Sequence, residues 1–113
     1  MKKMLFDDYY KDIRKNGIIH IFIQQDFHYD EIGKFHLSNS FKVDIIKKGI
    51  YLYNEYVLFS SFADCKRIAL EKCKEKGLKP EYIVFDKNAR DYTVDVYNID
   101  EIEEEILCKK KKN

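Results

Sequence analysis

The first sixteen residues carry apolar side chains at the spacing of an amphipathic helix. This apolar stripe lies on one side of a helical wheel, opposite the charged residues. Its members are Leu5, Phe6, Tyr9, Tyr10 and Ile13. Gly17 follows as a natural helix stop. The pattern predicts an N-terminal helix over residues 1–16 that packs its apolar side on a sheet.

Strand patterns begin at residue 18. Residues 18–27 are rich in β-branched side chains and apolar on both sides, which is typical of a central strand. Residues 28–40 contain Gly, Asn, Ser and Asp and predict a loop. The sequence therefore indicates one buried strand followed by an irregular connection.

A meander of three strands is predicted next. Apolar and charged residues alternate over residues 41–45, and residues 47–49 predict a tight turn into a strand over residues 50–53. Residues 54–55 predict a second turn, which would send residues 56–59 back as a third strand.

A helix over residues 62–76 has signals at both ends. Ser61 is a natural N-cap with Asp64 three residues later, and Gly77 and Pro80 provide a stop. Apolar positions share one side of this segment and charged positions share the other.

The last third of the chain predicts a hairpin and a helix. Residues 82–85 predict a strand, residues 86–89 a turn, and apolar positions alternate over residues 92–96 as in a second strand. Asn98 is placed to cap a final helix with isoleucines along one side.

These elements predict a single compact α+β domain over residues 1–108, followed by a basic disordered tail over residues 109–113. Their order is helix, four strands, helix, two strands, helix. Because the strands cluster in runs, we expect a mainly antiparallel sheet of about five to six strands, with three helices on one face, rather than alternating βαβ units. A chain of 113 residues can bury such a core without metals or disulfides.

No apolar run reaches the roughly 18 residues needed to cross a bilayer, and the N-terminus lacks the apolar segment of a signal peptide. We therefore expect a cytoplasmic protein with no membrane partner.

The three cysteines indicate neither disulfides nor a metal site. Cys65, Cys73 and Cys108 form an odd set without the spacing of metal ligands. Cys65 and Cys73 fall in the predicted helix and are expected to face the core. Cys108 is expected at a frayed chain end.

Catalytic chemistry has weak support in the sequence. His20, His28 and His36 match no metal-ligand spacing, and His20 falls within an apolar strand. The isolated glycines provide no phosphate-binding loop. We therefore expect no metal, no cofactor and no enzymatic activity. An enzyme that uses His28, Asp30 or His36 is the third alternative.

Charge is unevenly divided along the chain. Residues 81–107 carry nine carboxylates against Lys87 and Arg90, a net charge of −7, although the whole chain has a net charge of +1. Such division bears on partners rather than on fold. The leading hypothesis is a small non-enzymatic protein-interaction module, for example an inhibitor, that docks an acidic surface on a basic partner that handles nucleic acid. The predicted partner-binding residues are Asp91, Asp95, Asp100, Glu101, Glu104 and Glu105.

A nucleic-acid-binding domain is the alternative hypothesis. Strand tyrosines beside lysines match the way several modules stack single-stranded bases, although tyrosine also suits half-buried strands. The predicted nucleic-acid-binding residues are Lys42, Lys47, Lys48, Tyr51 and Tyr53. An exposed apolar strand edge would also permit a homodimer.

Overall fold

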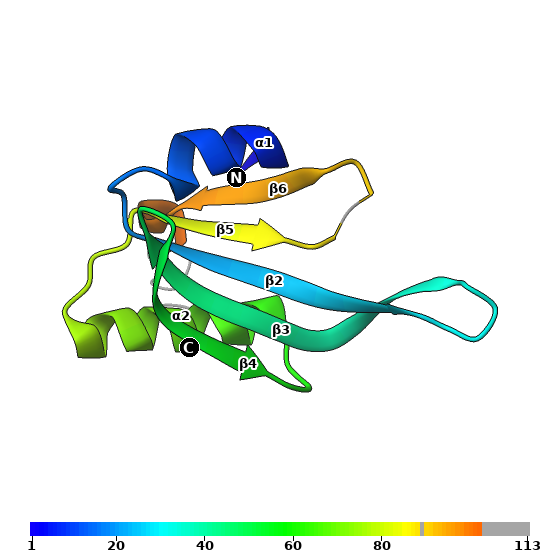
Figure 1. The fold of residues 1–113 in the computed structure, drawn as a ribbon. Coiled ribbons are helices and arrows are strands. Elements are labelled where there is room, and N and C mark those ends of the chain that lie inside the picture. The colour runs from blue at the N-terminus through cyan, green and yellow to red at the C-terminus, as the bar shows by residue number, and fades with distance from the viewer. Residues whose placement is uncertain (89, 103–113) are drawn as a thin grey trace.

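A six-stranded sheet with helices on both faces forms the fold (Figure 1). The computed structural model describes residues 1–88 and 90–102. The elements are β1 (Lys2–Leu5), α1 (Phe6–Tyr9), the π-helical segment η1 (Tyr10–Arg14), β2 (His20–Tyr29), β3 (Phe35–Lys47), β4 (Ile50–Val57), α2 (Phe62–Lys76), β5 (Tyr82–Asp86) and β6 (Thr93–Asn98).

Strand β2 lies in the interior of the sheet, whose strand order is β1-β6-β5-β2-β3-β4. It pairs in parallel with β5, and every other neighbouring pair is antiparallel. The first four residues of β2, His20 to Ile23, are buried, as the apolar run predicts for a central strand. The predicted mainly antiparallel α+β domain is confirmed.

Two hydrophobic cores lie on opposite faces of the sheet. On the first face, which we call the α2 face, helix α2 packs over residues such as Ile21, Val43 and Ile83. On the second, the α1 face, α1 and η1 pack over residues such as Phe22 and Val84. The prediction that all helices share one face is wrong. Successive strand residues point to opposite faces, and here both faces carry apolar side chains that need cover.

The predicted N-terminal helix is wrong at its start. The chain begins with β1, which pairs with β6, and the helix starts at Phe6 and continues through η1 to Arg14. Pairing with β6 gives the backbone of β1 its hydrogen-bond partners, and this tertiary pairing outweighs the local helical spacing. The apolar stripe still packs on the sheet as predicted, through the buried side chains of Tyr9 and Ile13.

The predicted loop over residues 28–40 is also wrong, because β2 and β3 extend through it as a hairpin. This hairpin arm projects beyond the rest of the sheet (Figure 1). Only residues 30–34 connect the two strands, and Gly33 supplies a φ of 81° there. Phe27 stacks on Phe35 across the arm, with 5.3 Å between ring centroids. Such cross-strand pairs depend on register, which the composition of the segment does not reveal.

Strand β4 runs without interruption through the predicted turn at residues 54–55. Tyr51 and Tyr53 pair with adjacent residues of β3, which leaves Leu52 as the extra residue of a β-bulge. Tyr51 pairs with Ile46 on the α1 face, whereas Tyr53 packs against the core on the α2 face. The bulge thus places these two tyrosines, which are two residues apart, on opposite faces of the sheet.

Several local predictions are confirmed. The turn between β3 and β4 has a left-handed backbone at Lys48 and Gly49, with φ of 51° and 73°. Helix α2 spans the predicted residues, with Ser61 as its N-cap and Gly77 ending it at a φ of 67°. Cys65 and Cys73 on this helix are buried in the core, as expected.

The described part of the chain ends in a helical segment at residues 99–102, where the sequence predicts the final helix to begin. The remainder of the predicted helix, Cys108 and the tail at residues 109–113 lie outside the described residues. Strands β1 and β4 form the two edges of the sheet, and the homodimer stays a prediction. None of the described helices has the length and apolar character needed to cross a membrane.

Ser61→Ala is expected to lower the free energy of unfolding by about 1 kcal/mol. Ser61 Oγ accepts the backbone N–H of Asp64 at 3.2 Å, and this donor would lose its partner. Urea denaturation followed by circular dichroism measures the change. Ser61→Asp keeps an acceptor and should retain nearly all of the stability; equal losses in the two variants would contradict the capping role.

Candidate functional site

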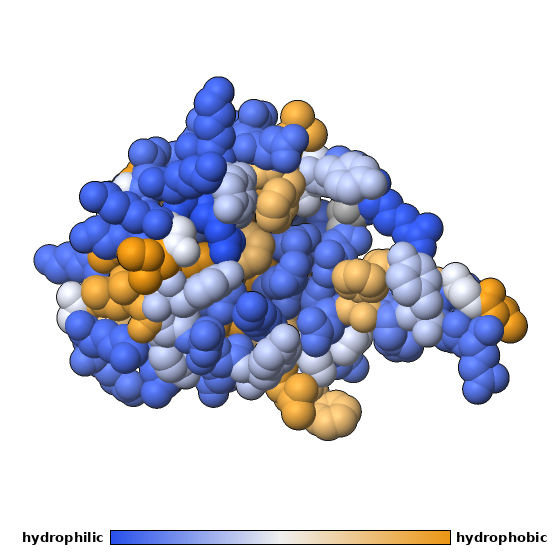
Figure 2. All heavy atoms as spheres, in the orientation of Figure 1, coloured by the Kyte–Doolittle hydropathy of each residue, from blue (hydrophilic) through white to orange (hydrophobic). Residues whose placement is uncertain are grey.

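The N-terminal helix covers only part of the α1 face. Its core includes residues of β2, β5 and β6 together with the end of β3. Further along β3, register places Asp44 opposite Phe22 and Lys42 opposite Gln24. Residues that lie directly opposite each other share a face, so both side chains belong to the α1 face. Figure 2 shows hydrophilic residues over the middle of this face.

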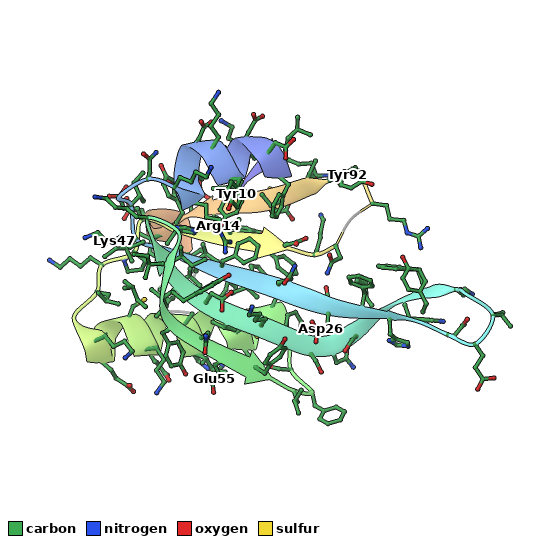
Figure 3. All side chains as sticks on the ribbon, in the orientation of Figure 1. Tyr10, Arg14, Asp26, Lys47, Glu55 and Tyr92 are labelled. Carbon is green, nitrogen blue, oxygen red and sulfur yellow. The ribbon has the colours of Figure 1, made fainter. Side chains whose placement is uncertain are left out.

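Arg14 lies at the boundary between the helix and this open half. Its Nη2 donates to the hydroxyl of Tyr51 at 2.7 Å, and its Nη1 donates to the hydroxyl of Tyr9 at 3.3 Å. The guanidinium carbon lies 5.5 to 5.6 Å from the ring centroids of Tyr10, Phe22 and Tyr51. Figure 3 shows Arg14 and Tyr10 next to each other below the helix. Arg14 is therefore fixed in place by hydrogen bonds and by cation–π contacts.

A buried pair of side chains supports Arg14 from below. The ring of Tyr9 stacks on Phe22 at 5.2 Å, and its hydroxyl lies 2.9 Å from Nε2 of His20. Both Tyr9 and His20 are fully buried. Burial lowers the pKa of His20 to about 4 and raises that of Tyr9, so both groups are neutral at pH 7. Nε2 of neutral His20 can accept a hydrogen bond from the Tyr9 hydroxyl. The Tyr9 oxygen can then accept a hydrogen bond from Arg14.

Asp44 is a buried carboxylate beside this network. It is 2% exposed, and its Oδ1 has no hydrogen-bond partner among the described residues. Burial raises the pKa of Asp44, while the charges of Lys42 and Arg14 oppose that rise. A buried carboxylate is costly unless cations lie close to it. Asp44 thus attracts the two cations to the surface of the sheet.

Three cations lie over two tyrosine rings on this side of the sheet. Lys42 Nζ lies 5.4 Å from the Tyr51 centroid, and Lys15 Nζ lies 4.9 Å from that of Tyr10. Tyr51 is 46% exposed and Tyr10 is 42% exposed, so part of each ring is open to a ligand. We call the group formed by Tyr10, Arg14, Lys15, Lys42 and Tyr51 the Arg14 surface.

The predicted nucleic-acid-binding residues are divided between the two faces. Lys42 and Tyr51 belong to the Arg14 surface, and Lys48 lies near it, because its backbone N–H and that of Gly49 donate to residues at the end of η1. Lys47 is exposed at the end of β3. Tyr53 lies on the α2 face and donates to Glu55 at 2.6 Å, which raises the pKa of Tyr53 to about 12.

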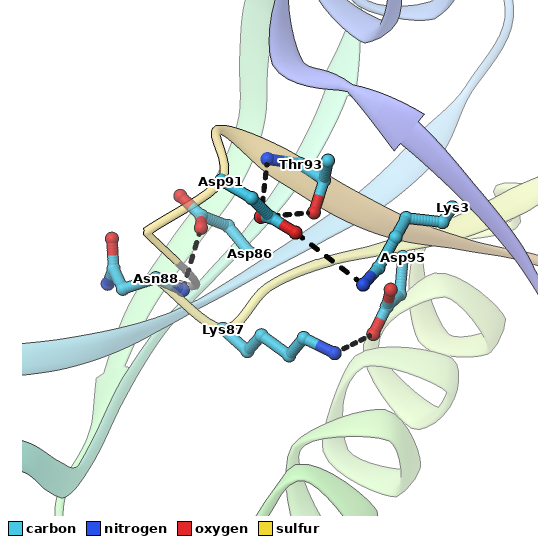
Figure 4. A network of polar contacts seen from close by, with 7 residues as sticks. All are labelled: Lys3, Asp86, Lys87, Asn88, Asp91, Thr93 and Asp95. Atoms are coloured by element: carbon cyan, nitrogen blue, oxygen red, sulfur yellow. Dashed lines mark hydrogen bonds and ion pairs between the residues drawn. The ribbon is translucent and has the colours of Figure 1, made fainter.

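Among the predicted acidic residues, Asp91 and Asp95 are engaged within the chain (Figure 4). Asp91 accepts from the backbone and hydroxyl of Thr93 and lies 3.6 Å from Lys3 Nζ. The Thr93 hydrogen bond is the main reason that the pKa of Asp91 is lowered. Asp95 is only 4% exposed and pairs with Lys87 at 3.1 Å.

The remaining acidic residues differ in their surroundings. Asp100 is exposed, and Glu101 pairs with the N-terminal ammonium group at 3.2 Å. Glu104 and Glu105 lie outside the described residues. The acidic partner-binding surface therefore stays a prediction, and three of its four described members already have a cation within the chain.

The histidines occupy two separate places. His28 and His36 stack across the hairpin arm, with 5.3 Å between ring centroids, and His36 Nε2 lies 2.8 Å from Asp30. His20 is buried under η1. Within residues 1–88 and 90–102, no group of three or more His, Cys, Asp or Glu side chains is placed to hold a metal ion.

Sequence reasoning missed three members of the Arg14 surface, which are Tyr10, Arg14 and Lys15. It also missed the role of three buried side chains beside that surface, which are Tyr9, His20 and Asp44. Asp44 carries a usable signal, since it is a charged residue within a strand whose neighbours are apolar. The sequence around Arg14 contains no such signal, because the role of Arg14 depends on where the end of the helix lies over β3 and β4.

No family model, no curated protein and no solved structure matches the chain. The function is therefore argued from the chemistry of the Arg14 surface.

Neutral, buried His20 predicts a loss of stability in acid. Its pKa is about 4 in the folded chain against an ordinary value of 6.5, so between these values the unfolded chain binds a proton that the folded chain does not. Stability is complete above pH 6.5 and falls as the pH drops toward 4, by on the order of 2 to 3 kcal/mol. Urea denaturation at pH 7 and at pH 4.5 measures this loss.

His20→Gln removes the titrating side chain and should show a smaller loss of stability over the same interval. His28→Gln, at an exposed position, is the control and should respond to pH as the wild type does. The same pH response in wild type and His20→Gln would show that His20 is not the group responsible.

Proposed function

We propose that the protein is a non-enzymatic binding module that binds single-stranded nucleic acid on the Arg14 surface. The observation that carries this proposal is the placement of three cations over two half-exposed tyrosine rings on one open face of a sheet. Cations attract the phosphates of a strand, and tyrosine rings accept its bases.

The fixed position of Arg14 favours binding. A free arginine loses side-chain entropy when it closes on a phosphate, but Arg14 is already held by Tyr9 and Tyr51. The hydrogen bonds to Tyr9 and Tyr51 use two N–H groups of the guanidinium, and its other N–H groups can donate to a phosphate oxygen. Lys42 and Lys15 add charge at the same place. Within residues 1–88 and 90–102 neither lysine forms an ion pair with a carboxylate at 4 Å or less, although the charge of Asp44 acts on Lys42.

A single strand fits this surface better than a duplex. Bases within a duplex are already stacked on one another, so a duplex would offer only phosphates to the cations. The open rings of Tyr10 and Tyr51 favour a ligand whose bases are free to stack. Stacking is also tolerant of sequence, so we expect weak sequence preference.

The hypothesis of an acidic docking surface has less support. Asp91, Asp95 and Glu101 are each paired with a cation of the chain, and a basic partner would have to displace those cations. The cations of the Arg14 surface lie over aromatic rings, and the carboxylate that attracts Arg14 and Lys42, Asp44, is itself buried. We therefore place nucleic-acid binding first.

Tyr51→Ala is expected to weaken binding of a fluorescein-labelled 12-nucleotide single strand by about 5- to 150-fold, the range for loss of one stacking ring. Lys42→Gln is expected to weaken binding and to reduce the slope of log K against log salt by about 0.7, the value for one lost phosphate contact with a single strand. Fluorescence anisotropy at several salt concentrations measures both quantities.

Lys72→Gln is the matched control. Lys72 Nζ lies 5.6 Å from the Tyr53 ring on the α2 face and also pairs with Glu75 at 3.3 Å. The variant therefore removes one positive charge from a cation–π contact on the other side of the sheet. It should leave affinity nearly unchanged. Equal losses from Lys42→Gln and Lys72→Gln, or tighter binding of a duplex than of the single strand, would contradict the proposal.

A further inference from the structure

A second feature of the α1 face is a cleft at the base of the hairpin arm. It has a volume of about 470 Å³, within the range of small-ligand sites. One wall comes from Phe27 and Phe35 of the arm, and the other from Phe6 and Tyr92. Figure 3 shows Tyr92 on the chain leading into β6, across from the arm. Three separate parts of the chain therefore bring aromatic rings to one cleft.

The wall formed by the arm is a built aromatic platform. Phe27 and Phe35 stack on each other, and Tyr29 packs edge-on against both rings at 5.9 and 5.7 Å. The Arg90 guanidinium carbon lies 4.6 Å from the Phe35 centroid. The cleft thus combines a flat apolar surface with the cation of Arg90 and the carboxylate of Asp86, which also lines it.

Tyr92 forms the opposite wall at an energetic cost. It is 83% exposed and has a φ of 59°, a left-handed backbone that is a genuine outlier for a bulky residue. Its carbonyl accepts the backbone N–H of Phe6 at 2.8 Å, which ties this backbone to the start of the helix. Strained positions of this kind gather at ligand sites.

The cleft lies further along β2 than the Arg14 surface. Phe22 lies under Arg14, Gln24 follows and donates to Asp86 at 3.0 Å, and Phe27 then lines the cleft. Five residues of a strand span roughly 16 Å. One extended strand of a few nucleotides can therefore reach both places on the same face.

We propose that the cleft holds one unstacked base of the bound strand, between Tyr92 and the Phe27–Phe35 pair, with Arg90 contacting an adjacent phosphate. This inference rests on the proposed function and names its second subsite. A base fits because it is planar, it can face aromatic rings on both sides, and it is joined to a phosphate that Arg90 attracts. Asn88 and Thr93 also line the cleft. Their side chains donate to Gln25 and Asp91 within the chain, and their oxygen atoms can still accept hydrogen bonds from the edge of the base.

Tyr92→Asn tests the inference, because asparagine tolerates the left-handed backbone but removes the ring. The probes are a fluorescein-labelled 12-nucleotide single strand and the same backbone made of abasic residues. Tyr92→Asn should weaken binding of the first probe by about 5- to 150-fold and leave binding of the abasic probe unchanged. Circular dichroism confirms that the variant folds.

Phe59→Asn is the matched control. Phe59 is 91% exposed with a φ of 52°, so it is also an aromatic residue on a left-handed backbone, but it does not line the cleft. It should bind both probes as the wild type does.

Two results would overturn the inference while leaving the proposed function intact. The first is wild-type affinity of Tyr92→Asn for the base-bearing probe, and the second is an equal loss for both probes. Absence of binding by the wild-type protein to the base-bearing probe would overturn the proposed function and the inference together.

Discussion

The structure depends on one constraint: a single helix is narrower than the six-stranded sheet that it covers. Six strands spaced by about 4.8 Å span roughly 24 Å, whereas a helix with its side chains is about 10 to 12 Å wide. The α1–η1 segment is a single helix wide and therefore covers only part of its face. The remaining part, over β3 and β4, carries the partly exposed side chains of Lys42 and Tyr51, with the buried carboxylate of Asp44 beside them. The open part of the α1 face thus follows from the presence of one helical segment on that side of the sheet.

Arg14 closes the boundary between the covered and open parts. On the covered side its partner is Tyr9, whose hydroxyl also meets buried His20. On the open side its partner is Tyr51 of β4, so one side chain joins the N-terminal segment to the far strand. The buried charge of Asp44 attracts Arg14 and Lys42 to the sheet. Stability and the proposed function therefore share the same residues: the network that fixes the end of the helix also presents its cations to a ligand.

Local signals predicted much of the fold, and non-local pairing accounts for what they missed. The caps of α2, the apolar run of β2 and the turn at Lys48 are local features, and the structure confirms each of them. Strand β1 depends on its pairing with β6, which is distant in the sequence. The hairpin arm depends on the register between β2 and β3, which the composition of the segment does not reveal. At the site, tyrosines and lysines on predicted strands pointed to Lys42 and Tyr51. The same reasoning includes Tyr53, but the bulge at Leu52 places Tyr51 and Tyr53 on opposite faces of the sheet. Arg14 could not be found, because its role depends on where the helix lies.

The central claim is that the open part of the α1 face binds a single strand, and a nuclear magnetic resonance titration tests it most directly. Uniformly ¹⁵N-labelled protein would be titrated with an unlabelled 12-nucleotide single strand. The account predicts shifts in the Arg14 Nε–H signal and in the amides of β3 and β4 around Lys42 and Tyr51, with the exposed side of α2 unaffected. Shifts concentrated on α2 or around Asp100 and Glu101, or no shifts at all, would contradict it.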